Sequence, residues 1–250
     1  MAKRGFLKPN LDDDFFKEDK VDVDAQKNTT FVYNPVQSWS LNAQQSRLPI
    51  AKNRDHILYL LEKNQVLVLI GGKMFRILNF THLNKIATLF SDTGCGKSTQ
   101  IPQFLAQAGW TDSNSMIGIT EPRRVAVTTL AARVAEESKS KIGYEVGYSI
   151  RFDECFSREV TKIKFMTEGI LIREMMGDPL LKSYSVIILD EAHERTVSTD
   201  ILMGLLKKVL RKRRELRVII SSATVGQNVM RDFLFQKSFK IFLFFPKGGC

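Results

Sequence analysis

The sequence has few cysteines and no long apolar run, and each scarcity excludes a class of protein. Its three cysteines, Cys95, Cys155 and Cys250, lack the CxxC spacing of zinc sites and the density of a disulfide-stabilised domain. No window reaches the roughly 20 uncharged apolar residues of a membrane span, and residues 1–20 lack the apolar core of a signal peptide. We therefore expect a soluble, intracellular chain in a reducing compartment.

The composition is that of a folded domain with a surplus of basic side chains. With 250 residues and 44% hydrophobic content, the chain can bury the core of one α/β domain. Its 37 Lys and Arg against 27 Asp and Glu give a formal net charge of +10. Such a balance favours a polyanionic partner, nucleic acid or an anionic surface, although an ordinary solvated basic surface explains it equally well.

The chain divides into an arm, a domain and a tail. Residues 1–46 are polar and mixed in charge, which predicts a flexible arm with local structure at most. Residues 47–224 carry the apolar periodicity of a folded domain, interrupted by an atypical insert at 71–92. Residues 225–250 form a divergent tail.

Short apolar runs alternate with helical patterns along the domain. Expected strands cover 66–70, 116–119, 162–166, 186–189 and 218–221, and expected helices cover 50–63, 98–108, 124–138, 169–176 and 199–212. Strands separated by helices predict βαβ units and a mostly parallel sheet flanked by helices.

The run TGCGKST, residues 93–99, has the composition of a phosphate-binding loop. Gly94 and Gly96 allow a tight backbone whose N–H groups face a phosphate. Lys97 supplies a positive charge for the phosphates, and the Ser98 hydroxyl is placed to hold Mg²⁺. The alternative is a glycine turn that precedes a lysine by chance.

A second acidic motif follows the expected strand at 186–189. Asp190 and Glu191 come directly after it, so they lie at the carboxyl end of a buried strand, where α/β sheets bind ligands. One carboxylate there anchors Mg²⁺ and another activates the attacking water. The two motifs together predict a nucleotide site.

In these segments the sequence resembles the DEAH-box ATP-dependent RNA helicases of the pre-mRNA-splicing type. The resemblance covers residues 31–70 and 93–224 and rests on five motifs in order: TGCGKST, TEPRRVAV at 120–127, TEG at 167–169, DEAH at 190–193 and SAT at 222–224. It implies a RecA-like P-loop NTPase domain over 47–224. It also implies ATP and Mg²⁺ as cofactors, RNA, spliceosomal and helicase-activating proteins as partners, and a nuclear location, with no membrane partner.

The resemblance also implies roles for single residues at the nucleotide. Residues Thr93, Gly94, Cys95, Gly96, Lys97, Ser98 and Thr99 would bind the nucleotide phosphates, and Arg133 would stack on the nucleobase. Ser98 and Asp190 would hold Mg²⁺, and Glu191 would be the general base. His193, Ser222 and Thr224 would couple the nucleotide to domain motion, while the alternative for His193 is a capping or solvent-exposed histidine.

On the RNA side, the resemblance implies contacts to the sugar-phosphate backbone. These would come from Arg123, Arg124, Arg151 and Thr167. Such contacts position RNA without reading its sequence. The alternative for Arg123 and Arg124 is a pair of surface salt bridges.

The sequence departs from the family pattern before the phosphate loop. Family members join the first strand directly to Gly-Glu and the loop, whereas this chain inserts residues 71–90 and has Ser91 and Asp92 in place of Gly-Glu. The insert contains IATLF, residues 86–90, which is itself a candidate buried strand. Two strands, 66–70 and 86–90, thus compete for the place that feeds the loop.

Beyond residue 224 the sequence shows no second RecA-like domain and no arginine finger, so we expect weak hydrolysis and no unwinding by these 250 residues alone. The interpretation is the N-terminal motor domain of a DEAH-box helicase that binds ATP·Mg²⁺ and the RNA backbone. The alternative is a non-catalytic RNA- or protein-interaction module, a decoy derived from such a helicase. Measured ATP binding distinguishes the two.

Overall fold

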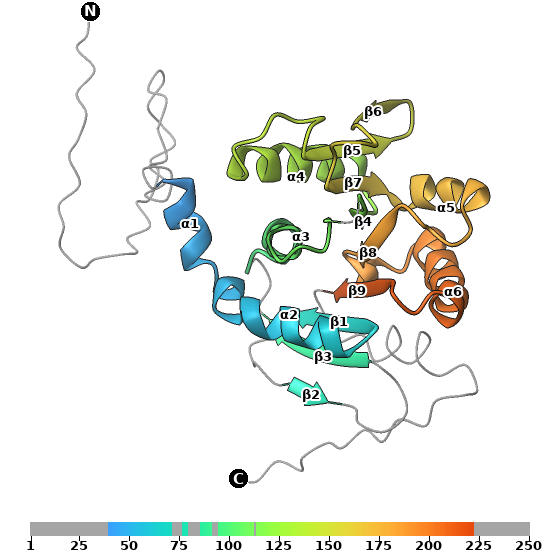
Figure 1. Ribbon diagram of the computed structural model, residues 1–250, viewed down its shortest axis with the longest axis horizontal. Coiled ribbons are helices and arrows are strands. Elements are labelled where there is room, and N and C mark those ends of the chain that lie inside the picture. The colour runs from blue at the N-terminus through green and yellow to red at the C-terminus, as the bar shows by residue number, and fades with distance from the viewer. Residues whose placement is uncertain (1–39, 72–76, 80–85, 92–94, 113, 223–250) are drawn as a thin grey trace, which may run out of the picture. The chain divides into compact units, whose positions relative to one another are not determined.

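A mostly parallel β-sheet runs through the domain, and helices cover both of its faces (Figure 1). The computed structural model describes residues 40–71, 77–79, 86–91, 95–112 and 114–222, all within the unit 39–250. This architecture confirms the predicted α/β class. The predictions for Thr93, Gly94, Thr224 and the tail 225–250 fall outside the described residues.

The described strands form one nine-stranded sheet in the order β2-β3-β1-β9-β8-β4-β7-β5-β6. Their bounds are β1 (Val66–Gly71), β2 (Ile77–Asn79), β3 (Ile86–Ser91), β4 (Met116–Glu121), β5 (Val146–Ile150), β6 (Asp153–Cys155), β7 (Ile163–Thr167), β8 (Tyr184–Leu189) and β9 (Arg217–Ser222). Of the described strands, only β2 and β6, at the two ends, pair antiparallel with their neighbours. The carboxyl ends of the parallel strands therefore meet at one edge.

Helices occupy most of the predicted positions. They are α1 (Leu41–Arg47), η2 (Pro49–Asn53), α2 (Arg54–Lys63), α3 (Lys97–Gln107), α4 (Arg124–Glu137), α5 (Glu168–Gly177), η3 (Ala192–Glu194) and α6 (Val197–Lys212). The helix predicted at 50–63 is split into a 3₁₀ turn and α2, and α1 lies at the end of the predicted arm. Every helix in the described ranges is too short or too polar to span a bilayer.

Two apolar layers hold the helices to the sheet. Along β1, Leu67 and Leu69 enter one core cluster, while Val66 and Val68 enter the other, as strand alternation requires. The first cluster takes in buried side chains of α2, α3 and α4, and the second those of α5 and α6. Figure 1 shows the sheet between these two groups of helices.

The sheet accommodates both candidate first strands. β1 keeps the inner place, because it pairs in parallel with β9 on one side and with β3 on the other. β3 runs parallel outside β1, with Gly71 opposite Ser91. β3, the strand that precedes the phosphate-loop sequence, is thus separated from β9 by β1. Both β1 and β3 end at the same edge of the sheet.

Candidate nucleotide-binding and catalytic site

The described part of the phosphate loop turns sharply into α3. Gly96 has a φ of 93°, and a Cβ at this position would lie 2.8 Å from Leu48 Cδ1, so only glycine fits here without strain. Cys95 is buried, and its carbonyl accepts a 3.3 Å hydrogen bond from the Ile50 backbone N–H. The 3₁₀ turn η2 therefore fixes the loop just before α3 begins.

Lys97 and Thr99 occupy the first turn of α3 behind this glycine. Lys97 Nζ lies 3.9 Å from the Cys95 sulfur, and the Thr99 hydroxyl donates to the Gly96 carbonyl at 3.4 Å. Gly96 has no side chain to cap the helix, so the positive end of the α3 dipole faces the loop. The Cys95 side chain packs in the apolar core.

Ser98 and Asp190 lie in direct contact although 92 residues separate them. The Ser98 hydroxyl donates to Asp190 Oδ2, and Asp190 Oδ1 accepts from the Glu191 backbone N–H at 2.8 Å. Asp190 is only 3% exposed, and its own N–H donates to the Thr120 carbonyl at 3.1 Å. The contact joins the start of α3 to the end of β8.

These two oxygens fit Mg²⁺ by their chemistry. Hydroxyl and carboxylate oxygens are hard ligands, and Mg²⁺ at a phosphate site takes only one or two protein ligands beside phosphates and water. Within the described ranges, no group of three or more His, Cys, Asp or Glu could hold an ion by itself. The pair suits an ion that arrives with a nucleotide.

The DEAH turn has an unusual backbone. Glu191 and Arg195 flank η3, and each has a φ of 49°, in the left-handed region that costs side-chain-bearing residues energy. His193 Nδ1 lies 3.2 Å from Glu191 Oε2. Burial, followed by the Asp190 carboxylate, raises the pKa of Glu191, which is the direction a general base near neutral pH requires.

Glu121 is a member of this acidic edge that sequence reasoning missed. It ends β4, is 2% exposed, and its carboxyl oxygen Oε1 has no hydrogen-bond partner among the described residues. Burial raises the pKa of Glu121 to about 9, and the Asp190 charge and a hydrogen bond to Asp190 add to the rise. Glu121 is thus neutral at pH 7. The sequence could have indicated this residue, because Glu121 comes just after the expected strand at 116–119, at the edge where ligands bind.

Ser222 ends β9 at the same edge. It is 4% exposed and lies opposite Ile70 of β1, while β9 pairs on its other side with β8. The residue therefore lies between the strand of the acidic motif and the first strand. Its predicted coupling role remains a prediction.

Arg133 is tied to the helix that follows the phosphate loop. Its Nε donates to Glu137 at 2.6 Å, and its Nη2 donates to Gln44 at 2.9 Å. Glu137 also accepts from Gln100 and Gln103 of α3, at 2.8 and 2.7 Å. Although burial opposes it, hydrogen bonds led by those from Gln45 and Gln103 lower the pKa of Glu137. The network fixes Arg133 beside α3, with its side chain 37% exposed.

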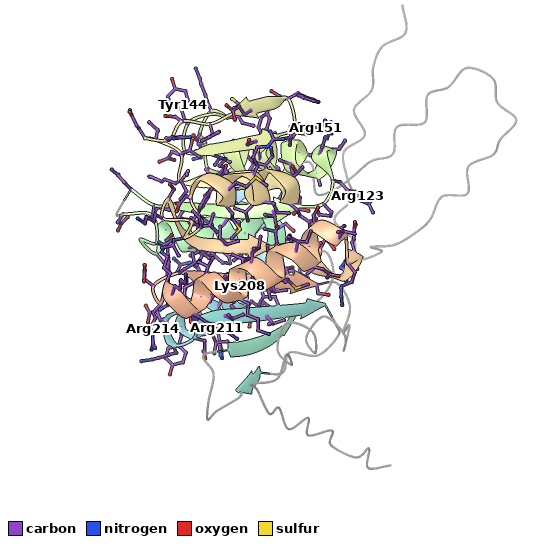
Figure 2. All side chains as sticks on the ribbon, turned by 90° about the vertical axis from the view of Figure 1, so that its right-hand side faces the viewer. Arg123, Tyr144, Arg151, Lys208, Arg211 and Arg214 are labelled. Atoms are coloured by element: carbon purple, nitrogen blue, oxygen red, sulfur yellow. The ribbon has the colours of Figure 1, made fainter. Side chains whose placement is uncertain are left out.

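The predicted RNA residues lie at the ends of three parallel elements. Arg123 follows β4 and pairs with Glu194 of η3 at 2.9 Å, and Arg124 begins α4. Arg151 follows β5, with its guanidinium 4.7 Å from the centre of an exposed phenylalanine ring. Thr167 is the N-cap residue of α5. Figure 2 shows Arg123 and Arg151 on the same side of the domain.

Comparison with known proteins identifies the family. Residues 51–232 match the family described as DEAD/DEAH box helicase, which is most of the chain. The chain belongs to this family. Its fold is therefore the RecA-like domain that the motifs predict, with the phosphate loop and the DEAH residues at one edge of the sheet.

Relatives with high identity cover most of the chain. The human "Probable ATP-dependent RNA helicase DHX35" is 50% identical over 219 residues, 88% of this chain and 28% of that protein. A Caenorhabditis elegans homolog of DHX35 is 48% identical over 80% of the chain and 24% of its own length. The Schizosaccharomyces pombe pre-mRNA-splicing factor ATP-dependent RNA helicase prp22 is 45% identical over 85% of this chain and 16% of its own length. The chain thus spans less than a third of these relatives' lengths.

Proposed function

We propose that this chain is the ATP·Mg²⁺- and RNA-binding N-terminal motor domain of an ATP-dependent RNA helicase. The observation that carries the proposal is the contact between Ser98 and Asp190. It brings together the two motifs that a P-loop NTPase needs, and Lys97 lies next to Ser98 in the first turn of α3. The relatives' names support an ATP-dependent activity on RNA.

The residues of the site have distinct tasks in this proposal. The start of α3 and Lys97 bind the β- and γ-phosphates, and Ser98 and Asp190 hold Mg²⁺, which neutralises phosphate charge when bound. Glu191, with its raised pKa, accepts a proton from the attacking water. Arg133, held by Glu137, offers the face of its guanidinium to the nucleobase.

Replacing Lys97 by alanine is expected to weaken ATP·Mg²⁺ binding by about tenfold or more. The reason is that the lysine ammonium supplies the charge opposite the β- and γ-phosphates at the helix start. Titration of the 250-residue chain with a fluorescent ATP analogue measures the change. Lys63→Ala, which removes an exposed lysine from the end of α2, is the matched control and should leave the affinity unchanged. Equal affinities for the parent and Lys97→Ala would contradict the proposed nucleotide site.

The RNA surface follows the carboxyl edge of the sheet. Arg123, Arg124 and Arg151 are all exposed there, so their guanidinium groups can reach phosphates from solvent. Thr167 opens α5 beside them, where helix N–H groups favour an anion. The splicing names among the relatives support a nuclear protein with spliceosomal partners, which we include in the proposal.

Changing Arg123, Arg124 and Arg151 together to alanine is expected to lower affinity for a single-stranded RNA and its salt dependence. Each lost phosphate contact removes about 0.7 from the slope of log K against log salt, so three contacts remove about 2. Fluorescence anisotropy with a labelled RNA between about 50 and 300 mM KCl measures both. The control removes the same charge elsewhere, through Lys139, Lys141 and Lys182. If both triple variants reduce binding equally, net charge and not this edge attracts RNA.

A non-catalytic interaction module is the second candidate, and one observation favours it. β3, which precedes the phosphate loop, lies outside β1 and not next to β9. A chain whose phosphate loop begins from this outer strand would keep its RNA surface and lose affinity for the nucleotide. Retained RNA binding with no measurable ATP binding would select this candidate.

A further inference from the structure

A groove between α5 and α6 lies apart from the nucleotide and RNA residues. Its volume is about 420 Å³, within the range of pockets that hold ligand groups. Its lining is Ile172, Met175, Met176, Pro179, Leu180, Leu205, Lys208, Val209 and Lys212. All but the two lysines are apolar. Met176 is 80% exposed, so the groove opens to solvent on its α5 side.

Basic side chains surround the end of this groove. Lys208 and Lys212 line it, and Arg211 and Arg214 are exposed beside them (Figure 2). Within the described part of the chain, none of these four makes an ion pair, whereas the adjacent Arg213 pairs with Glu215 at 2.9 Å. None of the described residues that line the groove is acidic. The surface is therefore apolar with an uncompensated basic margin.

Both walls of the groove begin at helicase motifs. α5 starts after Thr167, and α6 starts directly after the DEAH turn. The two starts are joined, because the hydroxyls of Thr196 and Thr199 donate to the Glu168 carboxylate. The groove lies along the later turns of the same two helices, away from this junction. An occupant would thus contact the helix that follows the DEAH turn and the helix that begins in the TEG motif, without covering the nucleotide edge.

We propose that this groove binds an acidic amphipathic helix of a partner protein. The occupant follows from the chemistry of the surface: helix-in-groove recognition needs an apolar trough, and the cationic margin selects glutamate or aspartate flanks. Met175 and Met176 give the trough an adaptable wall, since thioether side chains repack around different apolar groups. RNA suits the surface less well, because the described lining offers bases no aromatic ring to stack on and, apart from the ammonium groups of Lys208 and Lys212, consists of apolar side chains.

A labelled peptide tests the proposal on the 250-residue chain. The probe is a fluorescein-tagged, helix-forming peptide of about 18 residues, with leucines along one face and glutamates on its flanks. We expect saturable binding that Lys208→Glu with Lys212→Glu weakens by about tenfold or more. A counterpart peptide with lysines in place of the glutamates should bind to the parent chain about tenfold or more weakly than the glutamate peptide does. Lys139→Glu with Lys141→Glu makes the same charge change on another surface and should have little effect.

Met176→Glu separates the groove from general charge attraction. The residue is exposed, so the substitution should leave the thermal midpoint unchanged. It places in the apolar trough a negative charge that repels the glutamates of the peptide. Peptide affinity should fall by about tenfold. Unchanged affinity in this variant, or equal losses in the two lysine pairs, overturns the proposal. So does a loss of RNA affinity in Lys208→Glu with Lys212→Glu while peptide binding stays intact.

Methionine methyl NMR gives a readout that needs no substitution in the groove. With ¹³C-methyl methionine, the peptide should shift the signals of Met175 and Met176, which line the groove. The signal of Met166, which is buried in the sheet, should not move. Saturating peptide with no shift at Met176 refutes the site.

Discussion

Glu121→Gln is expected to raise the thermal midpoint at about pH 8 and to flatten the pH dependence of stability. Burial, then the charge of Asp190 and a hydrogen bond with it, raises the pKa of Glu121 from 4.5 to about 9. Glutamine has the shape of the protonated side chain and can donate to Asp190 as that form does, but it never ionises. Thermal unfolding of both chains, followed without Mg²⁺ and nucleotide between about pH 5 and 9, measures the difference.

The sign of the effect follows from proton binding. Between the unfolded pKa and about 9, the folded state holds the Glu121 proton while the unfolded state has lost it. The stability that this proton contributes is therefore fully present at pH values below the pKa of Glu121 in the unfolded chain. It is lost as the pH rises toward the pKa of Glu121 in the folded chain. The slope is at most about 1.4 kcal/mol per pH unit, so several kcal/mol are involved over the window. The Glu121→Gln substitution removes this slope.

The matched control is Glu62→Gln on the exposed side of α2. It removes one carboxyl group and leaves the acidic edge intact, so its pH profile should follow that of the parent. If Glu121→Gln and the parent lose stability equally between about pH 5 and 9, Glu121 is ionised in the folded state. The acidic edge would then hold its charges in a more polar environment than the burial of Glu121 indicates.

The sequence predicts the sheet and the meeting of the two motifs because both depend on local patterns. Apolar runs identify β1, β4, β7, β8 and β9, and the rule that parallel strands share a carboxyl edge places Asp190 near the phosphate loop. The contact between Ser98 and Asp190 is the geometry this rule anticipates. Periodicity needs no knowledge of distant residues to be read.

The parts that the sequence did not predict depend on contacts between distant residues. β5 is short and contains Gly147, so its pattern is weak, and it exists because β7 and β6 pair with its two sides. The network of Glu137 joins residues of α1, α3 and α4 that are up to 92 positions apart. The raised pKa of Glu121 likewise arises from its burial and, after that, from the charge of Asp190, which composition cannot show.

Excising residues 71–90 and changing Ser91-Asp92 to Gly-Glu is expected to tighten ATP·Mg²⁺ binding by about fivefold to tenfold. Gly71 and Ser91 lie opposite each other in the parallel register, so the excision places residue 91 where Gly71 now ends β1. The start of the loop thereby moves one strand spacing, about 4.8 Å, toward β9 and keeps its height along the sheet. A glycine at this start removes a conformational cost of about 1 kcal/mol wherever the loop requires positive φ. The fluorescent nucleotide titration measures the gain.

Two partial variants divide this gain between its causes. The excision alone makes β1 the strand that precedes the loop and retains Ser91-Asp92. The double substitution alone introduces the glycine and leaves β3 as the preceding strand. Because both changes act on one loop, their effects should not add, and the excision should help more after the substitution than before it. The far end of the loop should stay fixed in all variants, since the Cys95 carbonyl accepts from the Ile50 N–H and the Gly96 carbonyl accepts from the Gln100 N–H of α3. Equal affinity in the repaired and parent chains would mean that β3 already anchors the loop as well as β1 could, and the insert would then be an extension of the sheet without consequence for the nucleotide.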